Sequence, residues 1–525
     1  MNKMLALLLA ALLCLNIVVL AEENSIEDTS METPQTYTDP YSADLVVGYL
    51  AQGGVAVNPF VCNEWDIVNL NQLVFESMVE LDANQKPSPM LADNWTHEGK
   101  TWTFTLRSGI FFHNGYELNA MDVQNSFDAY MAAADRNPYS DRLSRLVSDL
   151  RAEDDRTVIV EGKYEGYLTL YAMTFPIVQT ETIYDELPRG TGPYWYVNYE
   201  ADSTIRIEVN PLWWKKQATT DSILFRHYPD AGTALEGLQR GQIDMFAARS
   251  TNAAVFRKLA NLTSMDFATT TYEMLVPNTN AESILSDLNV RKAIMYAINR
   301  TELASGAYLD MAIQSEVPVL PGTWLYESQS ARYYYSPERA LQLLYDAGWS
   351  DLTGDLKLSK LQGIQVKDLE IQIITYNDST NSMRENAAQM IADDLNQIGI
   401  KATWRVITRD AVRRRLKNGE YDIALVGVNL SEVPIVYNLL VSRGTLNYNN
   451  YSDITMDALV EQSLDASDEG DLQRVYSQIQ QRLVETLPFL GLLFRTGTVL
   501  STRSLGALNG IRAMNTFRGL EYLSE

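Results

Sequence analysis

The segment covering residues 369–434 most constrains the fold, because strand-like and helix-like patterns alternate along it. Apolar residues spaced by two predict a strand, whereas apolar residues spaced by three or four predict a helix. By this criterion, strands are predicted over residues 369–376, 400–407 and 421–428, and helices over residues 387–398 and 410–418. Helical connections of this length join parallel strands through right-handed crossovers. The segment is therefore predicted to be a βαβαβ unit of an α/β protein.

The loops that follow the strands of this unit are its candidate binding elements. In open sheets, ligands bind beyond the carboxyl ends of the strands. Two loops occupy that position, over residues 377–382 and residues 427–434. In the second loop we expect the main chain of Gly427 and Val428, and the side chain of Asn429, to contact a ligand. The unit would then form one wall of a binding cleft.

The length and composition of the chain narrow its class. A chain of 525 residues exceeds one ordinary hydrophobic core, so two or three domains are expected. Its net charge of −25 argues against a nucleic-acid partner, which would need a basic face, and against adhesion to anionic membranes. Its 3 histidines and 2 cysteines lack the spacing of a metal site, so neither a metal nor a cofactor is predicted.

The amino-terminal residues are predicted to target and tether the protein. Residues 1–21 combine Lys3 with a long apolar run and small residues before a polar boundary, which is the pattern of a secretory signal. Residues 22–42 are polar and acidic, which predicts a disordered tether. The body of the protein is therefore expected outside the cytoplasmic membrane, in the periplasm or at the cell surface. Besides simple cleavage, two forms of anchoring stay open: an uncleaved leader and a lipid on Cys14.

Several short motifs follow one another in a fixed order along the chain. Residues 87–130 contain Gly99-Lys-Thr-Trp-Thr-Phe-Thr-Leu-Arg107 and Gly109-Ile-Phe-Phe-His-Asn-Gly115. The later motifs are Gly190-Thr-Gly-Pro-Tyr194, Asn210-Pro-Leu-Trp-Trp214, Gly241-Gln-Ile-Asp-Met245, Asn289-Val-Arg-Lys-Ala-Ile-Met-Tyr-Ala-Ile-Asn-Arg300 and Ala347-Gly-Trp349 with Gly354-Asp355. Over about residues 43–500, this ordered set closely resembles the extracellular solute-binding proteins of ABC importers, family 5, the oligopeptide- and dipeptide-binding class.

The resemblance implies a two-lobed, periplasmic-binding-protein-like fold of type II (cluster C), with an additional α+β subdomain in the first lobe. The implied boundaries are residues 43–270 and 495–525 for the first lobe, about 67–186 for its subdomain, and 271–494 for the second lobe. A weak internal echo supports two similar halves. Residues 238–246 and 416–424 both place a leucine, a glycine and an aspartate three residues apart, at a predicted helix-to-strand junction.

The resemblance also implies a function. A member of this family would capture an oligopeptide between lobes that close by hinge bending, and would deliver it to a membrane permease and ATPase complex. It would be a monomer and would catalyse no reaction, so no catalytic residues are predicted. The first-lobe wall is expected over residues 52–64, with Gln52, Asn58 and Glu64 as contacts.

The chain departs from the pattern of the peptide binders after its third predicted strand. Those proteins anchor the amino terminus of the peptide on an aspartate, and alignment on Pro434 places Leu430 at that position. Two interpretations of Glu432 stay open, a replacement anchor for the amine and a solvated loop acid. Arg409 stands about where the peptide binders carry a pocket tryptophan. It either meets a carboxylate or phosphate of the ligand or belongs to a solvated basic helix face with Arg413 and its neighbours.

Other function classes fit the sequence less well. The main alternative is the same fold binding an oligosaccharide or a metal chelate, because some family members bind such ligands. A secreted glycoside hydrolase would need a pair of carboxylates across a cleft, and no segment singles out such a pair. A serine hydrolase would need a Gly-x-Ser-x-Gly turn, which the sequence lacks.

Overall fold

The structure, a computed structural model, describes residues 43–133, 136–378 and 382–523. The predicted signal (residues 1–21), the predicted tether (residues 22–42) and Cys14 lie outside the described residues. Ala43–Glu525 forms one compact unit. Among the described residues, no helix has both the length and the apolar character needed to cross a bilayer.

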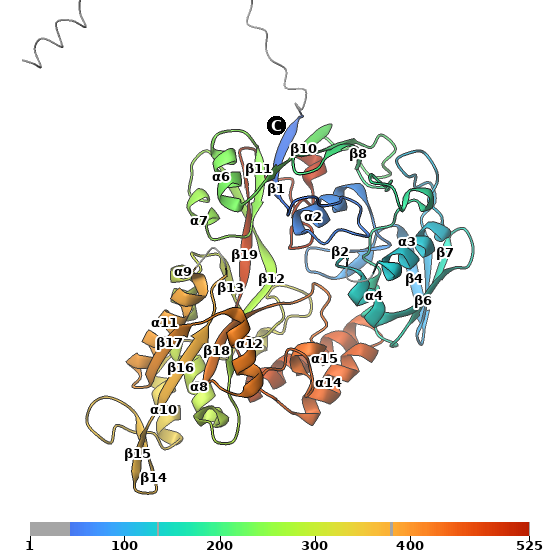
Figure 1. Cartoon of the computed structure of the whole chain (residues 1–525). Coiled ribbons are helices and arrows are strands. Elements are labelled where there is room, and N and C mark those ends of the chain that lie inside the picture. The colour runs from blue at the N-terminus through green and yellow to red at the C-terminus, as the bar shows by residue number, and fades with distance from the viewer. Residues whose placement is uncertain (1–42, 134–135, 379–381, 524–525) are drawn as a thin grey trace, which may run out of the picture. The chain divides into compact units, whose positions relative to one another are not determined.

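Within the described residues, 11 strands form one continuous mixed sheet (Figure 1). Its order is β17-β16-β18-β12-β19-β11-β1-β10-β9-β8, and β13 pairs with β19. The strands are β1 (Leu45–Leu50), β8 (Tyr194–Glu200), β9 (Thr204–Val209), β10 (Ser222–Tyr228), β11 (Met245–Ala248), β12 (Thr263–Pro277), β13 (Ala312–Gln314), β16 (Glu370–Thr375), β17 (Lys401–Val406), β18 (Ile423–Asn429) and β19 (Leu490–Ser501).

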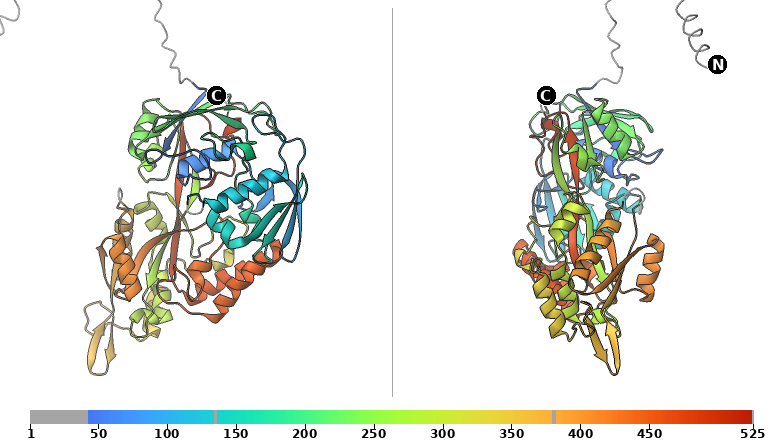
Figure 2. Two further views of the ribbon diagram at one scale, coloured as in Figure 1. Left: turned by 45° about the vertical axis from the view of Figure 1, so that its right-hand side comes forward. Right: turned by 90° about the vertical axis from the view of Figure 1, so that its left-hand side faces the viewer.

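Two long antiparallel strands, β12 and β19, connect the two ends of this sheet (Figure 2). The far half of β12 pairs with β18, whereas the far end of β19 pairs with β11. We call the part built on β1 and β8–β11 the first lobe and the part built on β16–β18 the second lobe. The lobes are therefore joined by shared strands, and the crossing strand predicted over residues 272–278 is one half of the longer β12. The boundaries inferred from the sequence stay a prediction.

The first lobe carries a second, antiparallel sheet of order β4-β5-β7-β6. Its elements are β4 (Ala92–Glu98), β5 (Thr101–Leu106), β6 (Val147–Ala152) and β7 (Thr157–Gly162), with α3 (Ala120–Ala132) and α4 (Ser140–Leu146) beside them. The predicted capping role of Asn119 is confirmed, because its side chain accepts from the backbone N–H of Met121 and Asp122. The short strand predicted between the turns at Gly109 and Gly115 is reduced to one bridge, from Phe111 to Glu117.

The sequence predicts helices over residues 68–79 and 287–300, and the structure corrects both. The helix predicted over residues 68–79 is α2 (Trp65–Val74), which ends early because the chain turns extended at Phe75 and then forms β2 (Val79–Leu81) against β3 (Pro87–Pro89). The helix predicted over residues 287–300 is broken into α8 (Leu288–Ala297) and α9 (Arg300–Gly306). The break occurs because the side chain of Asn299 caps α9 by accepting from the backbone N–H of Glu302.

The predicted βαβαβ unit of the second lobe is confirmed. Strand β16 pairs in parallel with both β17 and β18, and α11 (Met383–Gln397) and α12 (Arg409–Asn418) form the crossovers. Gly399 and Gly419 follow the two helices with φ angles of 83° and 71°, a conformation that favours glycine. On its other edge β18 pairs with β12 in the antiparallel sense, so it has one parallel and one antiparallel neighbour.

The two similar segments, residues 238–246 and 416–424, form the same helix-to-strand junction in each lobe. Asp244 precedes β11, and its carboxylate accepts a hydrogen bond from the backbone N–H of Val46 on β1 at 2.8 Å. Asp422 precedes β18, and its carboxylate accepts from the backbone N–H of Gln372 on β16 at 2.9 Å. In both lobes the aspartate therefore fixes a strand to its parallel neighbour just after a helix.

Two of the sequence motifs meet at the buried carboxylate of Glu76. This carboxylate accepts hydrogen bonds from Thr191 Oγ1 at 2.9 Å, Trp213 Nε1 at 3.2 Å and Trp214 Nε1 at 2.8 Å. Thr191 belongs to the motif at 190–194, and the two tryptophans belong to the motif at 210–214. These residues therefore hold the first lobe together.

The motif at 109–115 joins the same cluster through His113. Its Nδ1 accepts from the backbone N–H of Gly190, and its Nε2 lies 3.3 Å from the carbonyl oxygen of Gly192. A Cβ at Gly190 would approach the carbonyl oxygen of Val74 to 2.1 Å, so this turn needs glycine to pass α2. The expectation that His113 serves packing and turn geometry agrees with this position.

The buried histidine predicts a pH dependence of stability. Burial lowers the pKa of His113 from 6.5 to about 3, because the charged ring would lose its hydration. Between pH 6.5 and 3, His113 is protonated in the unfolded chain but stays neutral in the folded chain. The free energy of unfolding should therefore fall as the pH drops from 6.5 towards 3, by on the order of 4 kcal/mol from this residue.

Urea unfolding at several pH values in this window measures the effect. His113→Gln should be less stable than the wild type at pH 7 but should lose less stability on acidification. His97→Gln is the histidine control, because His97 is exposed and stacks on the Trp102 ring at the end of the β4–β5 hairpin, and it should keep the wild-type pH dependence. Parallel pH profiles for wild type and His113→Gln would contradict the prediction.

Candidate ligand-binding site between the lobes

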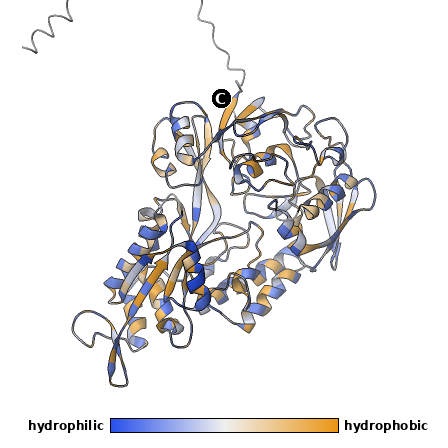
Figure 3. Cartoon of the chain, viewed as in Figure 1, coloured by the Kyte–Doolittle hydropathy of each residue, from blue (hydrophilic) through white to orange (hydrophobic). Residues whose placement is uncertain are grey.

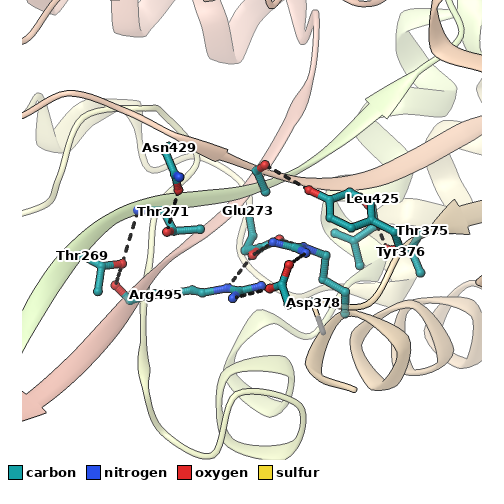
Figure 4. Close-up of polar contacts among 11 residues, drawn as sticks. Thr269, Thr271, Glu273, Thr375, Tyr376, Asp378, Leu425, Asn429 and Arg495 are labelled. Carbon is teal, nitrogen blue, oxygen red and sulfur yellow. Dashed lines mark hydrogen bonds and ion pairs between the residues drawn. The ribbon is translucent and has the colours of Figure 1, made fainter. Parts of the chain in front are cut away.

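A buried cluster of charges lies where the crossing strands enter the second lobe (Figure 4). The carboxylate of Glu273 on β12 is completely buried and pairs with Arg384 of α11 at 2.9 Å and with Arg495 of β19 at 2.6 Å. Asp378, in the loop after β16, pairs with the same two arginines at 2.8 and 2.9 Å. The charges of two arginines and two carboxylates thus balance, and they tie α11 and the loop after β16 to both crossing strands.

This cluster determines how β18 ends. A Cβ at Gly427 would lie 2.3 Å from Nη2 of Arg384 and 2.8 Å from a carboxylate oxygen of Glu273. Only glycine therefore lets β18 pass over the ion pair without moving it. The same residue starts the segment 427–434, which we call the cleft loop.

The cleft loop lines three cavities in succession. The strand-end cavity, of about 200 Å³, is lined by Gly427, Val428 and Asn429 together with side chains of α12. The central cavity, of about 50 Å³, is lined by residues 430–432 together with residues of both lobes. The subdomain cavity, of about 70 Å³, is lined by Glu432 and by side chains of the first lobe. Both smaller cavities therefore lie between the lobes.

The backbone of β18 is open on the side of the strand-end cavity. Strand β16 pairs with β18 only through Ile423 and Ala424, whereas β12 pairs with β18 along its whole length. Antiparallel pairing alternates, and the N–H of Leu430 donates to β12. The polar backbone groups of Gly427 and Asn429 therefore point away from β12, where the hydroxyl of Tyr376 already donates to the Gly427 carbonyl at 3.3 Å.

Two arginines from one face of α12 line the strand-end cavity. They are Arg409 and Arg413, one helical turn apart, and neither forms an ion pair with any described residue. The guanidinium of Arg409 lies 5.0 Å from the centre of the Tyr376 ring, and that of Arg384 lies 4.4 Å from the same ring. Figure 3 shows α12 as a strongly hydrophilic helix beside the hydrophobic strands of the second lobe. Arg413 lies four residues after Arg409, so helix periodicity alone could have predicted that both side chains line the same cavity.

Glu432 is a contact between the lobes in this structure. Its carboxylate pairs with Arg512 Nε at 3.2 Å and accepts from the backbone N–H of Met514 at 2.8 Å, and its side chain is only 6% exposed. The interpretation as a solvated loop acid therefore does not describe this conformation. Its role as an amine anchor stays a prediction, in which the amine would share a carboxylate that is already paired.

Arg142 of α4 is the main site residue that the sequence did not indicate. It lines the subdomain cavity, its guanidinium lies 4.8 Å from the centre of the Tyr139 ring, and its Nε is buried without an acceptor among the described residues. Burial lowers the pKa of Arg142, and the nearby groups Tyr139 and Glu432 oppose that shift. The amide oxygen of Asn515, on the same cavity, is also buried without a donor.

Comparison with known proteins shows the family of this chain. Residues 86–447, more than half of the chain, match the family model described as "Bacterial extracellular solute-binding proteins, family 5 Middle". The chain belongs to this family. Its resemblance to the family, noted above from short motifs, is thereby confirmed.

Similar proteins carry names that refer to different ligands. The oligopeptide-binding protein AppA of Bacillus subtilis is 23% identical over 94% of each chain. Heme-binding protein A of Haemophilus influenzae is 24% identical over 96% of this chain and 97% of its own length. A solved structure of a nickel ABC transporter protein from Bacillus halodurans, 20% identical, covers 92% of this chain and 99% of its own with a TM-score of 0.77, which shows the two-lobed fold.

The predicted first-lobe contacts of this solute-binding protein lie away from the three cavities. Asn58 is buried, and its amide group donates to the carbonyl oxygens of Ile183 and Asp185. Gln52 is exposed, and Glu64 is half-buried at the start of α2. The structure thus brings together Arg409, Gly427, Val428, Asn429 and Glu432 along the cleft loop, but not these three residues.

Further polar contacts join the lobes around and outside the central cavity. The hydroxyl of Tyr167 donates to Glu469 of α15 (Glu469–Thr486) at 2.9 Å, and Lys86 pairs with the same carboxylate. Trp324 Nε1 donates to the hydroxyl of Tyr171 at 2.8 Å. No group of three or more His, Cys, Asp or Glu side chains in the described part of the chain is arranged to hold a metal ion.

The buried cluster predicts a large effect of one substitution on stability. Glu273→Gln would remove the central negative charge and leave only Asp378 to compensate two buried guanidinium groups. Breaking a buried pair in this way costs about 3–5 kcal/mol. Glu370→Gln is the matched control, because it breaks a pair with Lys401 whose side chains are about half exposed, and should cost less than about 1 kcal/mol. Urea unfolding compares the two variants, and equal losses would contradict the role of the cluster.

Proposed function

We propose that this protein is the extracytoplasmic receptor of an ABC importer and captures an oligopeptide between its lobes. The observation that supports this proposal is the open backbone edge of β18 at Gly427 and Asn429, which faces the strand-end cavity. An extended peptide can pair its own main chain with such an edge, independently of its sequence. The relative named as an oligopeptide-binding protein supports the same ligand class.

The three cavities suit an extended chain. Successive side chains of a paired peptide point to opposite sides, so they need separate spaces along the strand. The central cavity offers aromatic walls from Tyr171, Trp324 and Tyr476. The subdomain cavity offers polar groups from the first lobe. A peptide that pairs with β18 and continues along the cleft loop would contact both lobes.

Contact with both lobes explains how the ligand would favour the closed state. A ligand shifts a conformational equilibrium only through its different affinity for the two states. Here the cleft loop belongs to the second lobe, while Arg142 and Arg512 belong to the first-lobe side of the subdomain cavity. A bound peptide would bridge them, and the closed form would be the one presented to the membrane permease and its ATPase.

The proposal includes the location of the protein and its partners. A secretory leader at residues 1–21 would export the chain, and the leader or a lipid on Cys14 would tether it beside the permease. The receptor would act as a monomer and without catalysis. Peptides incubated with the pure protein should therefore be recovered uncleaved by mass spectrometry.

Peptide binding can be tested with the purified mature protein. A panel of di- to octapeptides should raise the melting temperature, because a ligand at one hundred times its Kd stabilises the folded state by about 2.7 kcal/mol. An oligosaccharide and a nickel–histidine chelate are the comparison ligands. A clear response to either of these, with no response to any peptide, would overturn the peptide proposal.

The amine hypothesis for Glu432 has its own test. Glu432→Gln and Arg512→Gln both break the ion pair between the lobes, but only the first removes a partner for an amine. If Glu432 holds the ligand amine, Glu432→Gln should weaken binding of free-amine peptides more than of acetylated ones, as measured by calorimetry. Arg512→Gln should weaken both alike. The same pattern in both variants would remove Glu432 as the anchor.

A further inference from the structure

We infer that the ligand of this site is acidic, with carboxylate groups received by Arg409 and Arg413 at one end of the cleft loop and by Arg142 at the other. The inference rests on the proposed function for the position of the ligand along that loop. It adds a substrate class, because pairing with the backbone of β18 alone would accept peptides of any charge.

The acidic side chains that line the three cavities all have partners, either an ion pair or hydrogen bonds. Glu432 is paired with Arg512. Glu76 accepts three hydrogen bonds from Thr191 and the two tryptophans. Glu80 is paired with Arg518 at 3.5 Å. The carboxylate of Glu76 is held by neutral donors, whereas the strand-end cavity has no acidic side chain among its described lining residues to receive a cationic ligand.

The basic side chains that line the same cavities are mostly unpaired. Arg512 is neutralised by Glu432, but Arg142, Arg409 and Arg413 form no ion pair with any described residue. A guanidinium group in a confined site is stabilised by a carboxylate, often through two parallel hydrogen bonds. The strand-end cavity therefore presents uncompensated positive charge to the ligand, in a chain whose net charge is −25.

The basic face of α12 is not uniform with respect to the cavity. Of its five basic residues only Arg409 and Arg413 line the strand-end cavity. Arg415 lines a separate groove at the other end of strands β16 and β18. Arg414, which is exposed like Arg409 and Arg413, lines neither space. The two cavity residues lie at the i and i+4 positions, so one acidic side chain can reach both.

The length of the cleft loop limits the spacing of the two acidic groups. From Gly427 to Glu432 an extended chain spans at most about 17 Å. A peptide of about five residues covers that distance. An aspartate or glutamate side chain and the terminal carboxylate of such a peptide would then reach the two groups of arginines.

Matched pentapeptides test the inference by calorimetry. The series consists of an alanine pentapeptide with one residue changed to Glu, Gln or Lys, measured at low and at moderate salt. The negative net charge of the protein favours the lysine peptide, so a preference for the glutamate peptide has to come from the site. We expect the glutamate peptide to bind about tenfold more tightly than the lysine peptide.

Three substitutions assign the preference to residues. Arg413→Gln and Arg142→Gln should each lower the preference for the glutamate peptide at least threefold. Arg414→Gln removes the same charge from the same helix outside the cavity and should leave the preference unchanged. An equal effect of Arg413→Gln and Arg414→Gln, or binding without any charge preference, would overturn the acidic-ligand inference while leaving peptide capture intact.

A non-peptide tricarboxylate, citrate, separates this inference from the proposed function. If no peptide binds but citrate binds and depends on Arg413 and Arg142, peptide capture is overturned and the acidic site is supported. If neither citrate nor any peptide binds, both are overturned.

Discussion

The buried carboxylate of Glu273 is the constraint on which the rest of the structure depends. It lies on a strand shared by both lobes and is enclosed by two arginines from different elements. Because a buried charge without partners is costly, the elements that supply Arg384, Arg495 and Asp378 are fixed relative to the crossing strands. The ion pair also excludes any side chain at position 427. The glycine at the start of the cleft loop is therefore required by the ion pair of Glu273 and Arg384 beneath it.

Several residues of the ordered sequence motifs hold the scaffold together and line none of the three cavities. Thr191, Trp213 and Trp214 converge on Glu76, and Asp244 fixes one strand to its parallel neighbour. These residues can stay the same whatever the ligand is. Similar proteins named for oligopeptides, heme and nickel are consistent with this separation of scaffold from site.

The sequence predicted the parts of the fold that depend on local patterns. The βαβαβ unit and its glycine stops follow from periodicity and are present, whereas Asn429, predicted to lie beyond the third strand, is the last residue of β18. Interactions over long distances were not predictable. Arg142 reaches the site from far along the chain, and the partner of Glu432 lies in the carboxyl-terminal segment, so neither has a local signature. The break after α8 was missed because the apolar pattern continues across it.

The contacts of Glu469 with Tyr167 and Lys86 have a consequence for the rate of transport. With the lobes in contact around the small cavities, opening of the lobes to release a captured solute would require these bonds to break. Residence time would then be governed by the opening of the protein more than by the strength of each solute contact. A transporter that pulls the lobes apart would release strong and weak solutes at similar speeds, so uptake of different solutes would differ mainly in how often each one is captured.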